Sequence, residues 1–239
     1  MKKNKRNKTL EPLEIRAERW AEEAVDLLAE GEVVSIFLFD KDESFISLTD
    51  NIPSMVFIIK ELSSKNRDVL KNITTPFDNT VRPFFFSEQD FNQINLEFPL
   101  DLLAMKNGAV HLYGEEILNR VDINRDSLKF ATMRDLRSVH IQLVSLSITC
   151  GTQELNSGVF SAMSRLLPPF RGVLALRNAS VSTSWGSLVS AVESSCSISG
   201  FPFTKIISLL ENDEKNELSQ HTDSLISALE NLLTTASAS

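Results

Sequence analysis

Two short apolar runs, VVSIFLF at residues 33–39 and MVFII at residues 55–59, set the architecture of the first half of this 239-residue chain. Each run is too short for a typical helix and is rich in β-branched and aromatic residues, which indicates a buried β-strand. Gly31 precedes the first run, and the polar residues 40–44 follow it. The sequence therefore predicts two strands joined by a polar loop. Four of their side chains are expected in the core: Ile36, Leu38, Phe57 and Ile59.

The segments around these strands alternate between helix and strand. A helix is predicted over residues 13–30, because apolar side chains recur there at helical spacing and Gly31 ends the pattern. A polar helix over residues 62–73 follows, with Ser63 or Ser64 as its N-cap. Further strands are predicted at residues 81–86, 96–105 and 110–114. The strand at 81–86 contains Pro83, which favours the edge of a sheet.

The pattern changes after about residue 126. A long amphipathic helix is predicted over residues 128–149, and the remaining segments up to residue 235 are also helical. The expected fold class is α+β: a mixed β-sheet flanked by helices, followed by an all-α helical bundle. The predicted domains are a disordered basic arm at residues 1–11, an α/β domain at residues 12–126 and a helical domain at residues 127–235.

The composition excludes several classes of protein. A formal net charge of −8 and an isoelectric point near 5.0 argue against a general nucleic-acid binder, and no segment has a DNA-binding pattern. No apolar run reaches the roughly 18 residues that a membrane span needs. We therefore expect a cytoplasmic protein, in which Cys150 and Cys196 stay reduced.

Two motifs carry a resemblance to a known family. They are FPLDLLAMK at residues 98–106 and HLYGEEIL at residues 111–118, with RDLR at residues 134–137 as a further match. Together they resemble bacterial nucleotidyltransferase-like proteins, over roughly residues 12–211. Such proteins have a minimal nucleotidyltransferase domain followed by a helical domain, and are similar in plan to aminoglycoside nucleotidyltransferases.

The chemistry that this resemblance implies needs three features. A Gly-Ser turn after the first strand lets backbone N–H groups approach the nucleotide phosphates. An Asp-x-Asp at the start of the second strand holds two magnesium ions, which bridge the triphosphate and activate the attacking hydroxyl. A third carboxylate on a later strand completes the metal site.

The sequence departs from this pattern at each feature. Asp40 and Lys41 stand where the Gly-Ser turn would be, and Asn51 and Pro53 stand where the two aspartates would be. Only Asp101, or Glu97 nearby, corresponds to the third carboxylate. The resemblance therefore implies the fold without the catalysis, with no metal site, no cofactor and a role as a binding or interaction module.

Two alternatives remain open. In the first, the chain is an active nucleotidyltransferase with a rearranged site, and only this alternative requires magnesium and a nucleoside triphosphate. Its candidate residues are the carboxylates Asp40, Asp42, Asp50 and Asp101, with Lys41 and Asn51 as candidates for nucleotide binding. In the second, the first domain is only a scaffold, and the helical domain binds a protein partner or a second copy of the chain.

Overall fold

A computed structural model describes residues 12–39, 52–74, 81–181 and 184–238. The chain forms two compact units, which we call the sheet unit and the helical unit. The sheet unit takes residues 12–39, 53–91 and 110–116, whereas the helical unit takes residues 92–109 and those from 117 onward. The predicted α+β class is confirmed. The basic arm predicted at residues 1–11 lies outside the described residues.

The sheet unit is built on four strands in the order β3-β2-β1-β4. β1 (Val33–Phe39) and β2 (Ser54–Ile59) are the two predicted core strands, and they pair antiparallel. β3 (Arg82–Ser87) runs parallel to β2, and β4 (Val110–Gly114) runs antiparallel to β1. The sheet is therefore mixed, and β3 is an edge strand, as Pro83 predicts.

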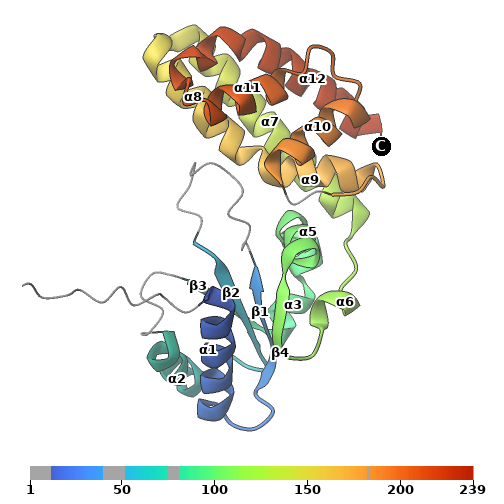
Figure 1. Ribbon diagram of the computed structural model, residues 1–239. Helices are drawn as coiled ribbons and strands as arrows, with labels where there is room; N and C mark the ends of the chain where they lie inside the picture. Colours follow the sequence, from blue (N-terminus) through green and yellow to red (C-terminus); the bar gives the residue numbers. More distant parts are fainter. Residues whose placement is uncertain (1–11, 40–51, 75–80, 182–183, 239) are drawn as a thin grey trace, which may run out of the picture. The chain divides into compact units, whose positions relative to one another are not determined.

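Two helices cover one face of this sheet (Figure 1). α1 (Leu13–Leu27) and α2 (Ser64–Thr74) contribute Ala17, Trp20 and Leu70 to a core cluster. A larger group of strand side chains completes this cluster, and it includes the four predicted core residues: Ile36, Leu38, Phe57 and Ile59. Each of these four is 0% exposed, which confirms the prediction.

Aromatic rings cover part of the opposite face. The helix α3 (Glu88–Asn92) brings Phe91 edge-on to Phe37 of β1 and to Phe86 of β3, with ring centroids 6.2 and 5.7 Å apart. Edge-to-face pairs of this kind add to the free energy of apolar burial. The sheet is thus packed by apolar side chains on both faces.

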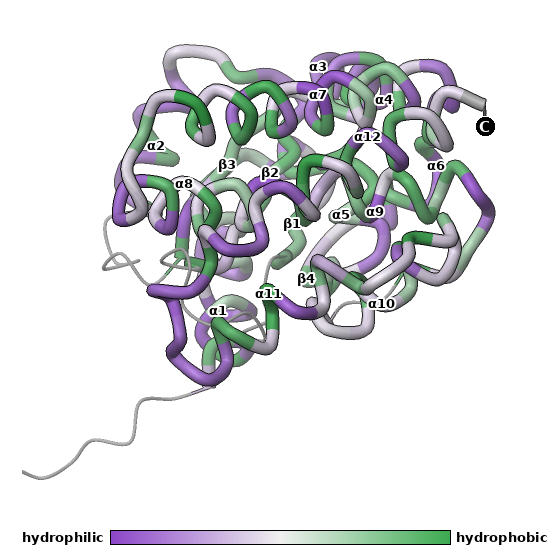
Figure 2. Tube along the Cα trace, turned by 90° about the horizontal axis from the view of Figure 1, so that it is seen from above, coloured by the Kyte–Doolittle hydropathy of each residue, from purple (hydrophilic) through white to green (hydrophobic). Residues whose placement is uncertain are grey.

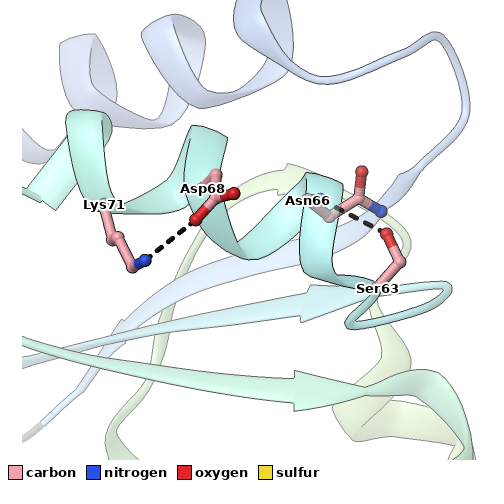
Figure 3. A network of polar contacts seen from close by, with 4 residues as sticks. All are labelled: Ser63, Asn66, Asp68 and Lys71. Carbon is pink, nitrogen blue, oxygen red and sulfur yellow. Dashed lines mark hydrogen bonds and ion pairs between the residues drawn. The ribbon is translucent and has the colours of Figure 1, made fainter.

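The start of α2 confirms a predicted cap. The backbone N–H of Asn66 donates to the Ser63 hydroxyl at 3.3 Å, which satisfies one of the first N–H groups of the helix (Figure 3). The Asn66 amide also donates to the Glu32 carboxylate at 3.0 Å and so ties α2 to the residue before β1. Farther along the helix, Lys71 and Asp68 form an exposed ion pair at 2.8 Å (Figure 3).

The strand predicted at residues 96–105 is wrong. This segment belongs to two helices, α4 (Ile94–Glu97) and α5 (Pro99–Gly108). Pro99 occupies the first turn of α5, where its missing N–H costs no intrahelical hydrogen bond. Leu100 and Leu103 then pack against Leu128 of the helical unit. An apolar run flanked by no Gly or Asn turn is as compatible with a buried helix as with a strand.

The rest of the helical unit follows a short helix, α6 (Ile117–Arg120). Its longest element is α7 (Arg125–Thr149), which begins three residues before the predicted start at 128, with Asn124 as its cap. Figure 2 shows hydrophobic and hydrophilic residues alternating along most of the helices, as expected where one side is buried. The later elements are α8 (Thr152–Arg165), α9 (Leu167–Leu176), α10 (Trp185–Ser195), α11 (Pro202–Glu211), the 3₁₀ helix η2 (Lys215–His221) and α12 (Thr222–Ala238). Within the described part of the chain, no helix has the length and apolar content to cross a membrane.

Candidate functional site

The strand register brings four strand ends to one side of the sheet. Phe39, the last residue of β1, pairs with Ser54, the first residue of β2. Ser54 in turn pairs with Arg82, the first residue of β3, and Leu38 pairs with Val110, the first residue of β4. We call Phe39, Ser54, Arg82 and Val110 the strand edge. This is the edge at which the resemblance implies metal and nucleotide binding, because it joins the end of the first strand to the start of the second.

The residues that join β1 to β2 lie outside the described part of the chain. They include five of the candidates drawn from the sequence: Asp40, Lys41, Asp42, Asp50 and Asn51. Their roles stay predictions. The described residues on either side, Phe39 and Pro53, fix where this segment leaves the sheet and returns to it.

The strand edge carries no carboxylate on its strands. None of β1, β2, β3 and β4 contains Asp or Glu. Ser54, which is 3% exposed, offers a neutral hydroxyl, and the exposed Arg82 offers a positive charge. The carbonyl oxygen of Pro53 accepts a hydrogen bond from the Arg82 N–H at 2.8 Å. Where the resemblance implies the second aspartate, the chain thus has a residue whose carbonyl oxygen is engaged by the sheet.

β3 is the strand on which a third carboxylate could share this edge with β2. The two strands are parallel, so their first residues lie side by side. After Arg82, however, β3 continues with Pro83 and three phenylalanines. Phe85 stacks on Phe57 with ring centroids 5.0 Å apart, which places aromatic packing along this strand.

Asp101, the sequence candidate for the third carboxylate, lies in a helix. It occupies the first turn of α5, in the helical unit, and Glu97 lies in α4. There the charge of Asp101 acts on Arg134 of α7. The pKa of the Arg134 guanidinium is raised above its usual value, first by a hydrogen bond to Asp135 and by the charge of Asp135, and to a smaller extent by Asp101. Asp101 is therefore not on a strand, as the sequence analysis expected.

Basic side chains are the described charges toward this end of the sheet. α1 runs antiparallel to β1, so its first turns lie toward the end of the sheet where β1 finishes (Figure 1). Arg16, in these turns, holds its guanidinium 5.6 Å from the centre of the Trp20 ring. Its buried Nε has no hydrogen-bond partner among the described residues. Arg16 and Arg82 give this end of the sheet unit a cationic rather than an acidic character.

Within the described residues, no three His, Cys, Asp or Glu side chains are grouped so that they could hold a metal ion. Two cavities lie away from the strand edge of the sheet or within the other unit. A cavity of about 300 Å³ lies at the opposite end of β1, between the last turn of α1, Val33 and Tyr113. A larger one of about 610 Å³ lies in the helical unit between α8 and η2, where Lys215 is 5.5 Å from the centre of the Phe160 ring.

The sheet order, the strand directions and the helices that follow define a nucleotidyltransferase-like fold. This is the fold of spectinomycin adenyltransferase AAD(9) from Enterococcus faecialis, whose crystal structure contains ATP and spectinomycin. The two chains share 12% sequence identity with a TM-score of 0.51, and the match covers 90% of this chain and 98% of the other.

A second solved structure is also similar, a nucleotidyltransferase-like protein from Exiguobacterium sibiricum 255-15. It has 15% identity and a TM-score of 0.41, over 93% of this chain and 75% of that one. No protein-family model matches the sequence, and no curated protein matches it significantly.

Proposed function

We propose that this chain is a nucleotidyltransferase-fold protein that no longer transfers a nucleotidyl group and acts as a binding or interaction module. One observation carries the proposal: the parallel starts of β2 and β3 present Ser54 and Arg82 in place of carboxylates. Two magnesium ions that share a site need several anionic oxygens as ligands. A hydroxyl and a guanidinium supply none, and the guanidinium repels a cation.

The same residues favour an anion at this edge. A guanidinium is a planar donor of several N–H groups and suits phosphate oxygens. Arg82 is exposed at the start of β3 and so is accessible to a ligand. The retained ability would therefore be binding of a phosphate-bearing molecule without metal, with Lys41 and Asn51 as further contacts.

An assay of nucleotidyl transfer tests the loss of catalysis. The protein is incubated with each labelled nucleoside triphosphate, with magnesium or manganese, and with cell extract as a source of acceptors. Spectinomycin adenyltransferase AAD(9), with ATP and spectinomycin, serves as the positive control. We expect no pyrophosphate above background. Release that disappears in Asp42→Ala or Asp101→Ala would instead support an active enzyme with a rearranged carboxylate site.

Calorimetric titration with ATP, in EDTA and then in magnesium, tests the binding role. We expect weak binding that magnesium does not strengthen, and a loss of roughly tenfold in affinity in Arg82→Ala, the effect of about 1.4 kcal/mol that a charge-assisted hydrogen bond supplies. Lys65→Ala, which removes an exposed cation from α2, is the matched control. The absence of any binding would favour the scaffold alternative, in which the helical unit carries the function.

A further inference from the structure

α7 has apolar side chains on two opposite sides. One side is buried in the helical unit and includes Leu136, Val139 and Leu143. The other side carries Phe130, Ile141 and Ile148, which are 70%, 56% and 78% exposed. At about 100° per residue these two sets lie roughly 180° apart around the helix axis. A surface helix normally has one apolar side, so the second one calls for a cover.

The exposed side has the spacing of a helix–helix seam. Its residues follow one another at alternating steps of four and three positions, which is the heptad repeat by which two helices pack along their length. The six positions are Phe130, Arg134, Arg137, Ile141, Val144 and Ile148, which we call the α7 seam. Four of them are apolar, and all but the half-buried Val144 are exposed.

The α7 seam is complementary to itself when a second copy runs antiparallel. With the symmetry axis near Val139, Phe130 lies opposite Ile148, Arg134 opposite Val144, and Arg137 opposite Ile141. Each arginine then lays its aliphatic stem along an apolar residue and can direct its guanidinium to water. A parallel arrangement would place each arginine opposite its own copy, and such pairs of like charges are unfavourable.

We propose that the α7 seam binds the same seam of a second copy in antiparallel orientation and forms a two-fold symmetric homodimer. Such an interface is isologous, since each residue contacts its counterpart in both directions. A seam of six side chains is smaller than the roughly 800 Å² per partner of a standard stable interface. The dimer is therefore weak and forms in the micromolar range or above.

Ionic strength gives the association a characteristic dependence. Each chain carries a net charge of −8, so two copies repel one another over long distances. Salt screens this repulsion, with a Debye length of about 10 Å at 0.1 M. Dimerisation through an apolar seam should thus strengthen as salt is raised.

Sedimentation velocity of the full chain, from about 10 μM to about 1 mM and at two salt concentrations, tests the proposal. We expect a monomer–dimer equilibrium that Ile141→Asp abolishes or weakens at least tenfold. Leu27→Asp, which alters an equally exposed apolar residue of α1, should leave it unchanged. Circular dichroism verifies that both variants are folded. A wild type that stays monomeric throughout, or an Ile141→Asp variant that dimerises as well as wild type, would overturn the proposal.

Disulfide crosslinking tests the orientation. In a background with Cys150→Ser and Cys196→Ser, one preparation carries Phe130→Cys and a second carries Ile148→Cys. Antiparallel packing predicts a crosslink when the two preparations are mixed and oxidised, and none in Phe130→Cys alone. Self-crosslinking of Phe130→Cys without the mixed product would overturn the antiparallel arrangement.

Discussion

The sheet unit and the helical unit differ in the polar groups that they bury. The buried polar side chains described in the sheet unit are the hydroxyls of Ser35 and Ser54. The helical unit buries a carboxylate, Glu193 of α10, which is 0% exposed. It accepts hydrogen bonds from the Phe203 N–H at 2.7 Å, from the Thr204 N–H at 3.1 Å and from the Thr204 hydroxyl.

This difference shows what a buried carboxylate needs in this fold. Glu193 closes the N-terminus of α11, where free N–H groups and the helix dipole stabilise a negative charge. The strand edge offers no such set of donors and, in the absence of metal ions, carboxylates grouped there would repel one another. The chain has kept a buried carboxylate where the backbone satisfies it, and has serine and arginine where only a metal ion would.

The largest expected effect concerns the apolar side of this comparison. Phe57→Ala should lower the free energy of unfolding by about 3–5 kcal/mol, because it removes a 0% exposed ring that stacks on Phe85. Phe84→Ala, which alters a neighbouring ring that is 38% exposed, should cost under about 1.5 kcal/mol. Urea denaturation measures both. A loss below about 1 kcal/mol in Phe57→Ala would mean that the sheet does not depend on this packing.

The next effect concerns the polar side. Glu193→Ala should cost about 2–4 kcal/mol, since the two N–H groups and the hydroxyl that it satisfies are left buried without a partner. Glu193→Gln keeps one acceptor oxygen and should cost less. Glu230→Ala, which removes an exposed carboxylate 3.3 Å from His140, should cost at most about 1 kcal/mol. Equal losses at Glu193 and Glu230 would remove the contrast between the two units.

A glycine pair sharpens the description of packing in the helical unit. A Cβ on Gly172 of α9 would lie 2.2 Å from the Thr132 hydroxyl oxygen and 2.8 Å from a Leu100 methyl group. Gly172→Ala should therefore cost about 1–3 kcal/mol through overpacking. A Cβ on Gly186 of α10 would meet no atom within 4 Å, so Gly186→Ala should be neutral or stabilise by up to about 1 kcal/mol. Thermal denaturation of both variants would contradict this if Gly172→Ala were the better tolerated.

The smallest effect belongs to the surface of the sheet unit. Lys71 donates a hydrogen bond to Asp68 and, together with its charge, lowers the pKa of that carboxyl below 3.8 (Figure 3). The lowered pKa stabilises the fold above pH 4, and this contribution is lost as the pH falls through the folded-state value. Both side chains are largely exposed, so the contribution to stability is small. An NMR titration should show the Asp68 pKa rising toward 3.8 in Lys71→Ala, and an unchanged value would contradict the pairing.

Much of the fold was predictable because its signals are local. The runs at residues 33–39 and 55–59 are strands, the helix at 13–30 is α1 with its end three residues earlier, and Ser63 caps α2. The segment at 96–105 failed because Leu100 to Met105 is a continuous apolar run, which lacks the period that separates a strand from a helix. The Phe98-Pro99 step was the available signal, since proline favours the first turn of a helix.

The site was less predictable, because it depends on which strands pair. The sequence indicates that Asn51 and Pro53 replace aspartates, but the parallel pairing of β2 with β3 is not visible in it. That pairing identifies Arg82 as the neighbour of Ser54 and removes Asp101 from the strands. The residue before the phenylalanine run of β3 could have been singled out only if the direction of that strand had been known.

The division of the chain between the two units has a consequence for the order of folding during synthesis. The sheet is complete only when β4 has been made, yet α5 precedes β4 in the chain and belongs to the helical unit. Leu100 and Leu103 of α5 find their partners Leu128, Ala131 and Leu176 only later in translation. A ribosome releasing this protein from its N-terminus should therefore hold a finished sheet beside an unsatisfied apolar helix. Until α7 and α9 emerge, that helix would be the part of the nascent chain that a chaperone binds.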